Sequence, residues 1–538
     1  MEQIDKTKEL ETRSIKQLLW IYALPSVTSQ VIASVYNIVD RVFLGQSVGA
    51  LAIAGLAITL PIMNIIHAFG SLVGAGSGAR MSIVLGRKDI RWAEKILGNS
   101  MLLTFLFGFL FVTGGYLFMD PILHMFGASA DTIAYARQYM QIVLPGMFLT
   151  TLTFNLTGLI RATGYPAKSM WIMVGGALAN IALDALFIPV LGWGIAGAAW
   201  ATTLSMAGSS VFAIWHFLPK PLFGRHDDEE DTGIRETEPG PQAHRPMINV
   251  GLANADAPVS SVARAGRRQT QAFIRFKKHC WEPKFYIFRN ILAIGISPFS
   301  MNLAASAVVA LLNRQLIRFG GDMAVGTYGI VNSFSSIVFM LLLGVCQGMQ
   351  PIAGYNYGAG HCERLKETYL LTMKVNIVGG AIGCLMAIFI PRAIISCFTT
   401  DQAMIEMGIP ALRYLMVMLP LIGVTVTNSQ FFQSIDKPWI AITTSLSRQV
   451  IFLIPAMYIV PSLFVRWGGD GLTGVWASCT ICDFLGTVLA MALLLTQLDV
   501  FRPGYVPKER RPRKEATPRE TEKRDEAPGS PTGTASLK

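Results

Sequence analysis

An acid inside an apolar segment is the side chain in this sequence with the clearest potential for chemistry. The segment from Trp20 to Leu44 is long enough to cross a membrane, and Asp40 lies near its far end. An ionisable group inside a spanning helix costs roughly 3 kcal/mol on insertion scales, so it is normally retained because it faces a cavity or a partner. Tyr36 lies one helical turn earlier on the same face. Two interpretations stay open here: a functional acid, or an acid that has passed the hydrocarbon into the outer interface.

The elements that must position this acid are membrane helices, because the composition excludes a soluble protein. Of the 538 residues, 52% are hydrophobic and only 15% are charged, which is too few charges for a soluble chain of this size. The formal net charge of +11 lies in short connections and two long polar segments rather than on a basic module, so we predict no nucleic-acid partner. Seven scattered cysteines predict no disulfide framework.

Apolar runs of roughly 20 residues, the length of a membrane span, recur about twelve times along the chain. We therefore predict an all-α polytopic membrane protein with twelve transmembrane helices. The spans are expected near 18–43, 51–84, 96–118, 133–157, 169–190 and 195–218, and near 287–317, 324–357, 370–391, 407–432, 440–461 and 473–497.

These spans divide the chain into five expected regions. They are an N-terminal tail (1–17), a six-helix lobe (18–218), a polar insert (219–286), a second six-helix lobe (287–498) and a basic tail (499–538). The insert ends in a basic, aromatic stretch. Two interpretations of that stretch remain open: a segment lying on the anionic inner leaflet, or a solvated linker.

Orientation follows from the Lys and Arg residues of the short loops. They gather after the second, fourth and eighth spans and are nearly absent after the first, third and fifth. Positive loops face the cytoplasm, so both termini are predicted to be cytoplasmic. No cleavable signal-peptide pattern opens the chain. We expect a multi-pass protein of the bacterial inner membrane.

The two halves of the chain resemble each other. YMQIVLP, ending at Pro145, corresponds to YLMVMLP, ending at Pro420, and RATGYPAK from Arg161 corresponds to QSIDKPWI from Gln433. Copies of six spans enter the membrane in the same sense, which makes them parallel repeats that build two lobes around a central cavity. This plan predicts a carrier with alternating access. The sequence has no Walker motif, so an ion gradient rather than ATP is the expected energy source.

Over about 15–218 and 287–498, the chain resembles the multidrug and toxic compound extrusion (MATE) transporters, in particular the bacterial branch with MepA-like and DinF-like members. Besides the repeat, the resemblance rests on GAGSGARMSIVLGRKD from Gly74, QPIAGYNYGA from Gln350 and GWGIAGAAWAT from Gly192. It implies secondary active export of amphipathic, cationic organic compounds in antiport with H⁺ or Na⁺. The long insert departs from the family pattern and leaves regulation open.

The resemblance also implies a cation site in the first lobe. Its residues correspond to Asp40, Asp184, Asn180, Tyr36 and Thr202, of which Asp40, Asn180, Asp184 and Thr202 would hold Na⁺, and Pro25 corresponds to a helix-bending proline. Spacing supports the site, because Asn180 and Asp184 are four residues apart on one helix face. Asp40, Asp184 and Thr202 also fall within roughly one helical turn of the same depth. Such oxygen donors suit an alkali cation, and no other cofactor is predicted.

Simpler roles for two of these residues stay open. Asn180 could serve only a contact between helices, and Thr202 could hydrogen-bond to its own helix. Weaker candidates for the substrate cavity are Asn155, by resemblance, and His67, Arg314 and Asp483, as polar groups within spans. Arg314 could pair with Asp483 or extend outward to the interface. Gly70, Gly74 and Gly78 recur every fourth residue and predict a closely packed helix face.

The sequence fits three other functions less well than export. A lipid-linked saccharide flippase would favour a cavity rich in Arg and Lys, and few such residues lie mid-span. A membrane enzyme would need a catalytic cluster, whereas His67, His124 and His216 are dispersed, so no enzyme is predicted. A non-transporting scaffold would not need two membrane acids. The expected partners are small drug-like substrates and membrane lipid, and we expect a monomer.

Overall fold

The computed structural model describes residues 6–47, 50–126, 132–218 and 274–505, and every regular element in these ranges is a helix. The prediction of an all-α fold is confirmed. The first half contains α1 (Lys6–Thr12), α2 (Ile15–Ser47), α3 (Ala50–Gly86), α4 (Ile90–Leu117), α5 (Met119–Met125), α6 (Ile133–Ala162), α7 (Pro166–Ala185), the π-helical turn η1 (Leu186–Val190) and α8 (Gly194–Phe217). The second half contains η2 (Lys278–Trp281), α10 (Phe285–Ala359), α11 (Cys362–Phe389), α12 (Pro391–Ser396), α13 (Gln402–Met416), α14 (Leu419–Ser434), α15 (Pro438–Leu446), the π-helical turn η3 (Ser447–Phe452), α16 (Leu453–Arg466), α17 (Gly471–Leu495) and η4 (Leu498–Phe501).

The described helices include fewer separate candidate spans than the predicted twelve. Within the described ranges, nine helical segments are long and apolar enough to cross a membrane, or ten if the bent pair α13 and α14 forms one span. One of the nine is α10, a 75-residue segment that a non-helical residue, Gly321 with φ +66°, divides in two. Because a span needs roughly 20 residues, α10 is long enough to supply two spans.

Local sequence signals explain where several helices begin. The Asp89 carboxylate accepts a hydrogen bond from the Trp92 backbone at 3.1 Å and caps α4. Pro166 starts α7 and Pro438 starts α15, a position where proline loses no helical hydrogen bond. Both of these helices then continue into a π-helical turn, η1 or η3. The same pattern therefore recurs in the two halves, at the segments that the internal repeat pairs.

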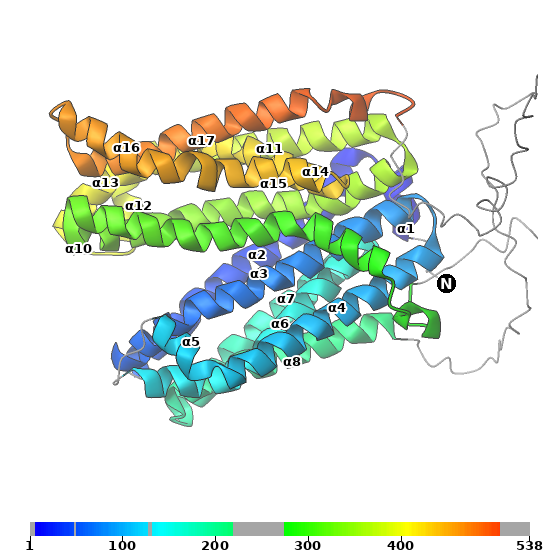
Figure 1. Cartoon of the computed structure of the whole chain (residues 1–538), viewed down its shortest axis with the longest axis horizontal. Coiled ribbons are helices and arrows are strands. Elements are labelled where there is room, and N and C mark those ends of the chain that lie inside the picture. Colours follow the sequence, from blue (N-terminus) through cyan, green and yellow to red (C-terminus); the bar gives the residue numbers. More distant parts are fainter. Residues whose placement is uncertain (1–5, 48–49, 127–131, 219–273, 506–538) are drawn as a thin grey trace, which may run out of the picture.

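The helices of the two halves lie together at one end of the molecule and diverge toward the other end (Figure 1). We call the end that contains α1 and the last turns of α3 the closed end. At the opposite end, α5 and η1 of the first half lie apart from α12 and α16 of the second half (Figure 1). From the closed end inward, the described helices bring the backbones of the two halves together (Figure 1).

Glycines make this close approach between α3 and α10 possible. A Cβ atom on Gly295 would lie 1.7 Å from the carbonyl oxygen of Leu72, and one on Gly358 would lie 2.0 Å from that of Ile83. Both distances are far below van der Waals contact, so neither position accepts a side chain without movement of a helix. Gly76 and Gly86 of α3 approach the backbone of α10 equally closely. Together with Gly295 and Gly358 they form a glycine seam between α3 and α10 that extends over roughly four helical turns.

Polar contacts add to the glycine seam. Arg80 of α3 pairs with Asp436, in the turn between α14 and α15, at 3.4 Å, and the two side chains are only 9% and 8% exposed. Removing one partner from so buried an ion pair leaves an uncompensated charge, which costs about 3–5 kcal/mol. The pair therefore favours the conformation in which the two halves meet at this end.

Helix α1 packs across the same end, which the expectation of a plain N-terminal tail did not anticipate. The Arg364 guanidinium donates to the carbonyl oxygens of Leu10 at 3.0 Å and Arg13 at 2.7 Å. Glu11 accepts from the Tyr355 hydroxyl at 3.4 Å and pairs with Lys88 at 3.5 Å. Because Tyr355 and Lys88 belong to different halves, α1 joins the two halves at the closed end.

The described end of the insert also differs from both earlier interpretations, while 219–273 lies outside the described residues. Residues 274–284 dock on α4, where the buried Glu94 carboxylate meets Lys277 and His279, each at 2.9 Å. Asn99 of α4 donates to the Glu282 carbonyl oxygen at 3.0 Å and accepts from the Lys284 backbone at 2.8 Å. This stretch is therefore neither a free linker nor a segment held only by lipid.

Candidate functional site

The centre of the predicted cation site is one buried face of α7. Asn180 is 1% exposed and Asp184 is 0% exposed. Among the described residues, neither carboxylate oxygen of Asp184 has a hydrogen-bond partner, and neither does the amide oxygen of Asn180. The four-residue spacing places these three oxygens on the same side of the helix. A fully buried group of acceptors without donors is exceptional, because buried polar groups are normally paired.

Two neighbouring helices contribute the other predicted residues. Asp40 of α2 lies close enough to Asp184 for their negative charges to interact, and α2 packs directly on α7. On α8, the Thr202 hydroxyl accepts from the Asn180 amide nitrogen at a long 3.5 Å. This contact directs the Asn180 nitrogen toward α8. Asp40, Asn180, Asp184 and Thr202 thus gather between three helices, as the sequence predicts.

A further residue of this group escaped the sequence analysis. Tyr139 of α6 is buried, and its hydroxyl lies within electrostatic range of Asp40, Tyr36 and Asp184. A tyrosine near the end of an apolar span ordinarily indicates an anchor at the membrane interface. The sequence therefore offered no local signal for Tyr139, and only the packing of α6 against α7 in the folded chain identifies it.

Asp184 shares this site with a second acid, Asp40, and no cation pairs with Asp184 in the described part of the chain. An ionised carboxylate at zero exposure, without hydrogen bonds, carries a desolvation cost of several kcal/mol. A proton on the carboxylate, or a small cation between the oxygens of Asp184 and Asn180, removes that cost. The residues present therefore fit a site for H⁺ or Na⁺, since carboxylate, amide and hydroxyl oxygens are the ligands that hard cations prefer.

Pro25, the predicted bending residue, lies inside α2, which continues past it as one helix. Around it, the hydroxyls of Ser26, Thr28 and Ser29 each donate to the carbonyl oxygen four residues earlier, at 2.9 Å. Such bonds often bend helices, and proline removes one backbone bond of its own. The residues around Pro25 thus supply the local conditions for a hinge in α2.

Asn155 requires a correction. Its side chain is 0% exposed. Its oxygen accepts from Ser77 at 2.7 Å, and its nitrogen donates to Ser100 at 3.3 Å and Thr104 at 3.0 Å. The amide is thus fully engaged in joining α3, α4 and α6 inside the first half. We no longer expect Asn155 to contact a substrate directly.

The remaining weaker candidates occupy separate places. His67 of α3 is exposed, with its ring 5.7 Å from that of Phe154. Arg314 of α10 is also exposed. Of the alternatives for Arg314, a pair with Asp483 is not what forms, because the buried Asp483 carboxylate pairs with Arg448 of η3 at 3.0 Å. That internal cation compensates the acid of the second half, whereas Asp184 of the first half has no such compensation among the described residues.

Comparisons with known proteins agree with this fold. The MatE family model matches residues 25–186 and 298–459, one match in each half and together more than half of the chain. The chain is 25% identical to the multidrug export protein MepA of Staphylococcus aureus (strain MRSA252) over 481 residues, covering 89% of this chain and 93% of that protein.

Two further proteins also match this chain over most of their length. MepA of Staphylococcus saprophyticus is 23% identical, with 91% of this chain and 95% of that protein covered. A solved structure, described as the outward-facing conformation of a multidrug resistance MATE family transporter of the MOP superfamily, superposes with a TM-score of 0.77 at 20% identity, covering 93% of this chain and 99% of that one. The chain belongs to the MatE family of multidrug efflux transporters.

Proposed function

We propose that this protein exports amphipathic, cationic organic compounds in exchange for H⁺ or Na⁺ by alternating access. The observation that carries the proposal is the set of buried, unpartnered oxygens of Asp184 and Asn180 beside Asp40. A purely structural role gives no reason to bury two acids side by side, whereas a site that alternately binds and releases a cation can use both. The multidrug export proteins among its relatives support the substrate class.

The coupling step that we propose begins when a cation neutralises Asp40 and Asp184. Neutralisation removes the repulsion between α2 and α7, and α2 shifts about the hinge at Pro25. On both sides of Pro25, α2 packs on α10: Ala23 lies against Gly348, and Val27 lies against Gly344. A shift of α2 therefore reaches the second half directly. Cation binding then lowers substrate affinity, provided that cation and substrate prefer different conformations.

The positive-inside rule assigns the closed end to the cytoplasm, since Arg87, Lys88 and Arg364 all lie there. With this orientation, the halves meet on the cytoplasmic side and diverge on the outer side (Figure 1). The conformation is then outward-facing, the state in which a substrate leaves and a cation enters the site.

Native Cys397 tests this orientation. It is the only exposed cysteine among the described residues, and it follows α12 at the end opposite α1. The other six are buried, and at the closed end burial raises the pKa of the Cys280 thiol, which further lowers its reactivity. We expect a membrane-impermeant maleimide to label Cys397 in right-side-out vesicles and the label to disappear in Cys397→Ser. Labelling of Cys397 only in inverted vesicles would reverse the orientation.

Separately imposed ion gradients test the transport itself. In inverted vesicles, we expect a cationic dye to accumulate when the lumen is acidic or rich in Na⁺, because the cation then flows outward through the site as it would flow into a cell. The gradient that drives accumulation identifies the coupling ion. Equal dye movement with and without either gradient, measured by fluorescence, would exclude antiport.

A further inference from the structure

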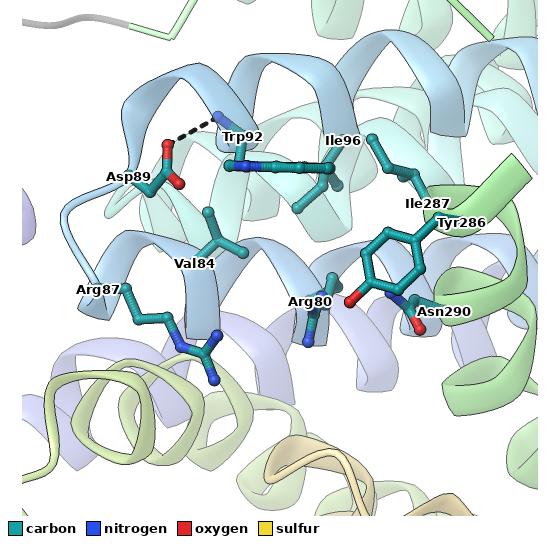
Figure 2. A pocket seen from close by; sticks show the side chains of 9 residues that line it. All are labelled: Arg80, Val84, Arg87, Asp89, Trp92, Ile96, Tyr286, Ile287 and Asn290. Atoms are coloured by element: carbon teal, nitrogen blue, oxygen red, sulfur yellow. Dashed lines mark hydrogen bonds between the residues drawn. The ribbon is translucent and has the colours of Figure 1, made fainter. Parts of the chain in front are cut away.

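A small cavity at the closed end lies outside the cation site. It opens between α3 and α4 of the first half and the first turns of α10 (Figure 2), and its volume is about 30 Å³. At about 10–15 Å³ for each water-sized group, it has room for two or three such groups. Its polar lining consists of Arg80, Arg87, Asp89, Tyr286 and Asn290. This size and lining suit one compact, oxygen-rich chemical group rather than a drug.

Two polar side chains in this lining have no partner among the described residues. The Tyr286 hydroxyl is buried without a hydrogen bond. Asn290 is only 4% exposed, and its side-chain amide makes no hydrogen bond to the described part of the chain. Figure 2 shows both side chains reaching toward Arg80. The buried Tyr286 hydroxyl, a donor without a partner beside a guanidinium, indicates a missing acceptor.

The charges around the cavity favour an anion. Arg80 and Arg87 bring two guanidinium groups. Of the acids nearby, Asp89 accepts from the Trp92 backbone and caps α4, and Asp436 accepts from a terminal nitrogen of Arg80 at a long 3.4 Å. Arginine forks bind phosphate oxygens through paired hydrogen bonds, and the hydroxyl of Tyr286 and amide of Asn290 can donate to the remaining oxygens.

The surroundings place the cavity at the level of lipid headgroups. The Trp92 and Tyr286 rings pack edge to face at 6.2 Å. Next to them, Phe285 is 80% exposed and Trp281 is 41% exposed. Exposed aromatic side chains beside arginines are typical of the membrane interface on the cytoplasmic side. We propose that this cavity binds a phosphate group, which an anionic phospholipid of the adjoining leaflet or free inorganic phosphate can supply.

A bound phosphate has a direct structural consequence. Arg80 and Arg87 belong to the first half, whereas Tyr286 and Asn290 belong to α10 of the second half. The phosphate therefore bridges the two halves beside the Arg80–Asp436 pair. Its binding stabilises the closed end and favours the conformation described above.

Thermal unfolding of the purified, full-length protein in phosphatidylcholine nanodiscs tests the site. One series adds phosphatidylglycerol to the bilayer, and a second adds inorganic phosphate to the buffer against an equal concentration of chloride. We expect at least one of these additions to raise the unfolding midpoint of the wild type.

Tyr286→Phe keeps the ring against Trp92 and should weaken the apparent affinity for phosphate by about tenfold through the loss of one charge-assisted hydrogen bond. Tyr458→Phe, at an exposed position on α16, is the matched control and should respond like the wild type.

The two series of additions distinguish the two sources of phosphate. A response to phosphatidylglycerol alone identifies a lipid headgroup as the source, and a response to inorganic phosphate identifies the free anion. Asn290→Ala, which removes a second donor, should show the same loss and serves if Tyr286→Phe does not fold. No stabilisation of the wild type by either addition, or equal stabilisation in the wild type and both variants, would overturn the proposal.

Discussion

Replacing Asp184 with asparagine is expected to reduce cation-driven efflux sharply while leaving the protein folded. Asparagine has nearly the same shape as the protonated acid but can neither gain nor lose a charge, so the repulsion between α2 and α7 no longer depends on the bound cation. Coupling free energies of the usual size correspond to about 5- to 150-fold. We expect driven dye efflux from proteoliposomes to fall by a factor in this range, and Asp40→Asn to act in the same direction.

The matched control is Asp120→Asn. Asp120 of α5 is another acid of the first half, but it is about half exposed and pairs with Arg137 at 2.6 Å. An exposed ion pair contributes little, so efflux by this variant should stay near the wild-type rate. Gradient-driven efflux by Asp184→Asn at the wild-type rate would remove Asp184 from the coupling step.

Gly295→Leu is expected to open the closed end. Even a Cβ atom at this position would lie 1.7 Å from the Leu72 carbonyl oxygen, so a leucine forces α3 and α10 apart. Overpacking typically costs about 1–3 kcal/mol, which shifts a two-state equilibrium by roughly 5- to 150-fold. Spin labels at positions 91 and 366, which are exposed on the two halves, should therefore report longer distances and a smaller population with the halves together.

The control for this substitution is Gly175→Leu. Gly175 of α7 has no atom within 4 Å of its added Cβ, so a leucine there should leave the label distances and transport unchanged. A folded Gly295→Leu protein with the wild-type distance distribution would show that the glycine seam does not control opening.

Local periodicity predicted much of the cation site, which lies in the first half of the chain. Asn180 and Asp184 share a face because helices repeat every 3.6 residues, and this relation holds whatever packs around them. The same reasoning predicted a packing face at Gly70, Gly74 and Gly78. The structure confirms it, since all three face residues of α6: Thr151, Phe154 and Gly158.

Long-range packing explains what sequence reasoning missed. Tyr139 joins the site only because α6 packs against α7, which brings its hydroxyl within electrostatic range of Asp40 and Asp184. Arg448 compensates Asp483 from the π-helical turn η3, and no sequence spacing indicates that the two residues meet. The docking of 274–284 depends on Glu94 and Asn99, which lie about 180 residues earlier in the chain. Polar composition predicts a break between the lobes, but it could not predict that residues 274–284 pack on α4.

Cation release upon substrate binding tests coupling through Asp184 most directly. If cation and substrate favour different conformations, each must weaken the binding of the other by the same factor. Adding a cationic dye to purified wild-type protein in weakly buffered, Na⁺-free solution should release protons, or dye should lower the affinity for Na⁺ if Na⁺ is the coupling ion. Asp184→Asn should still bind dye but show neither effect. Dye binding to the wild type without any change in bound H⁺ or Na⁺, or an equal change in Asp184→Asn, would contradict coupling at this site.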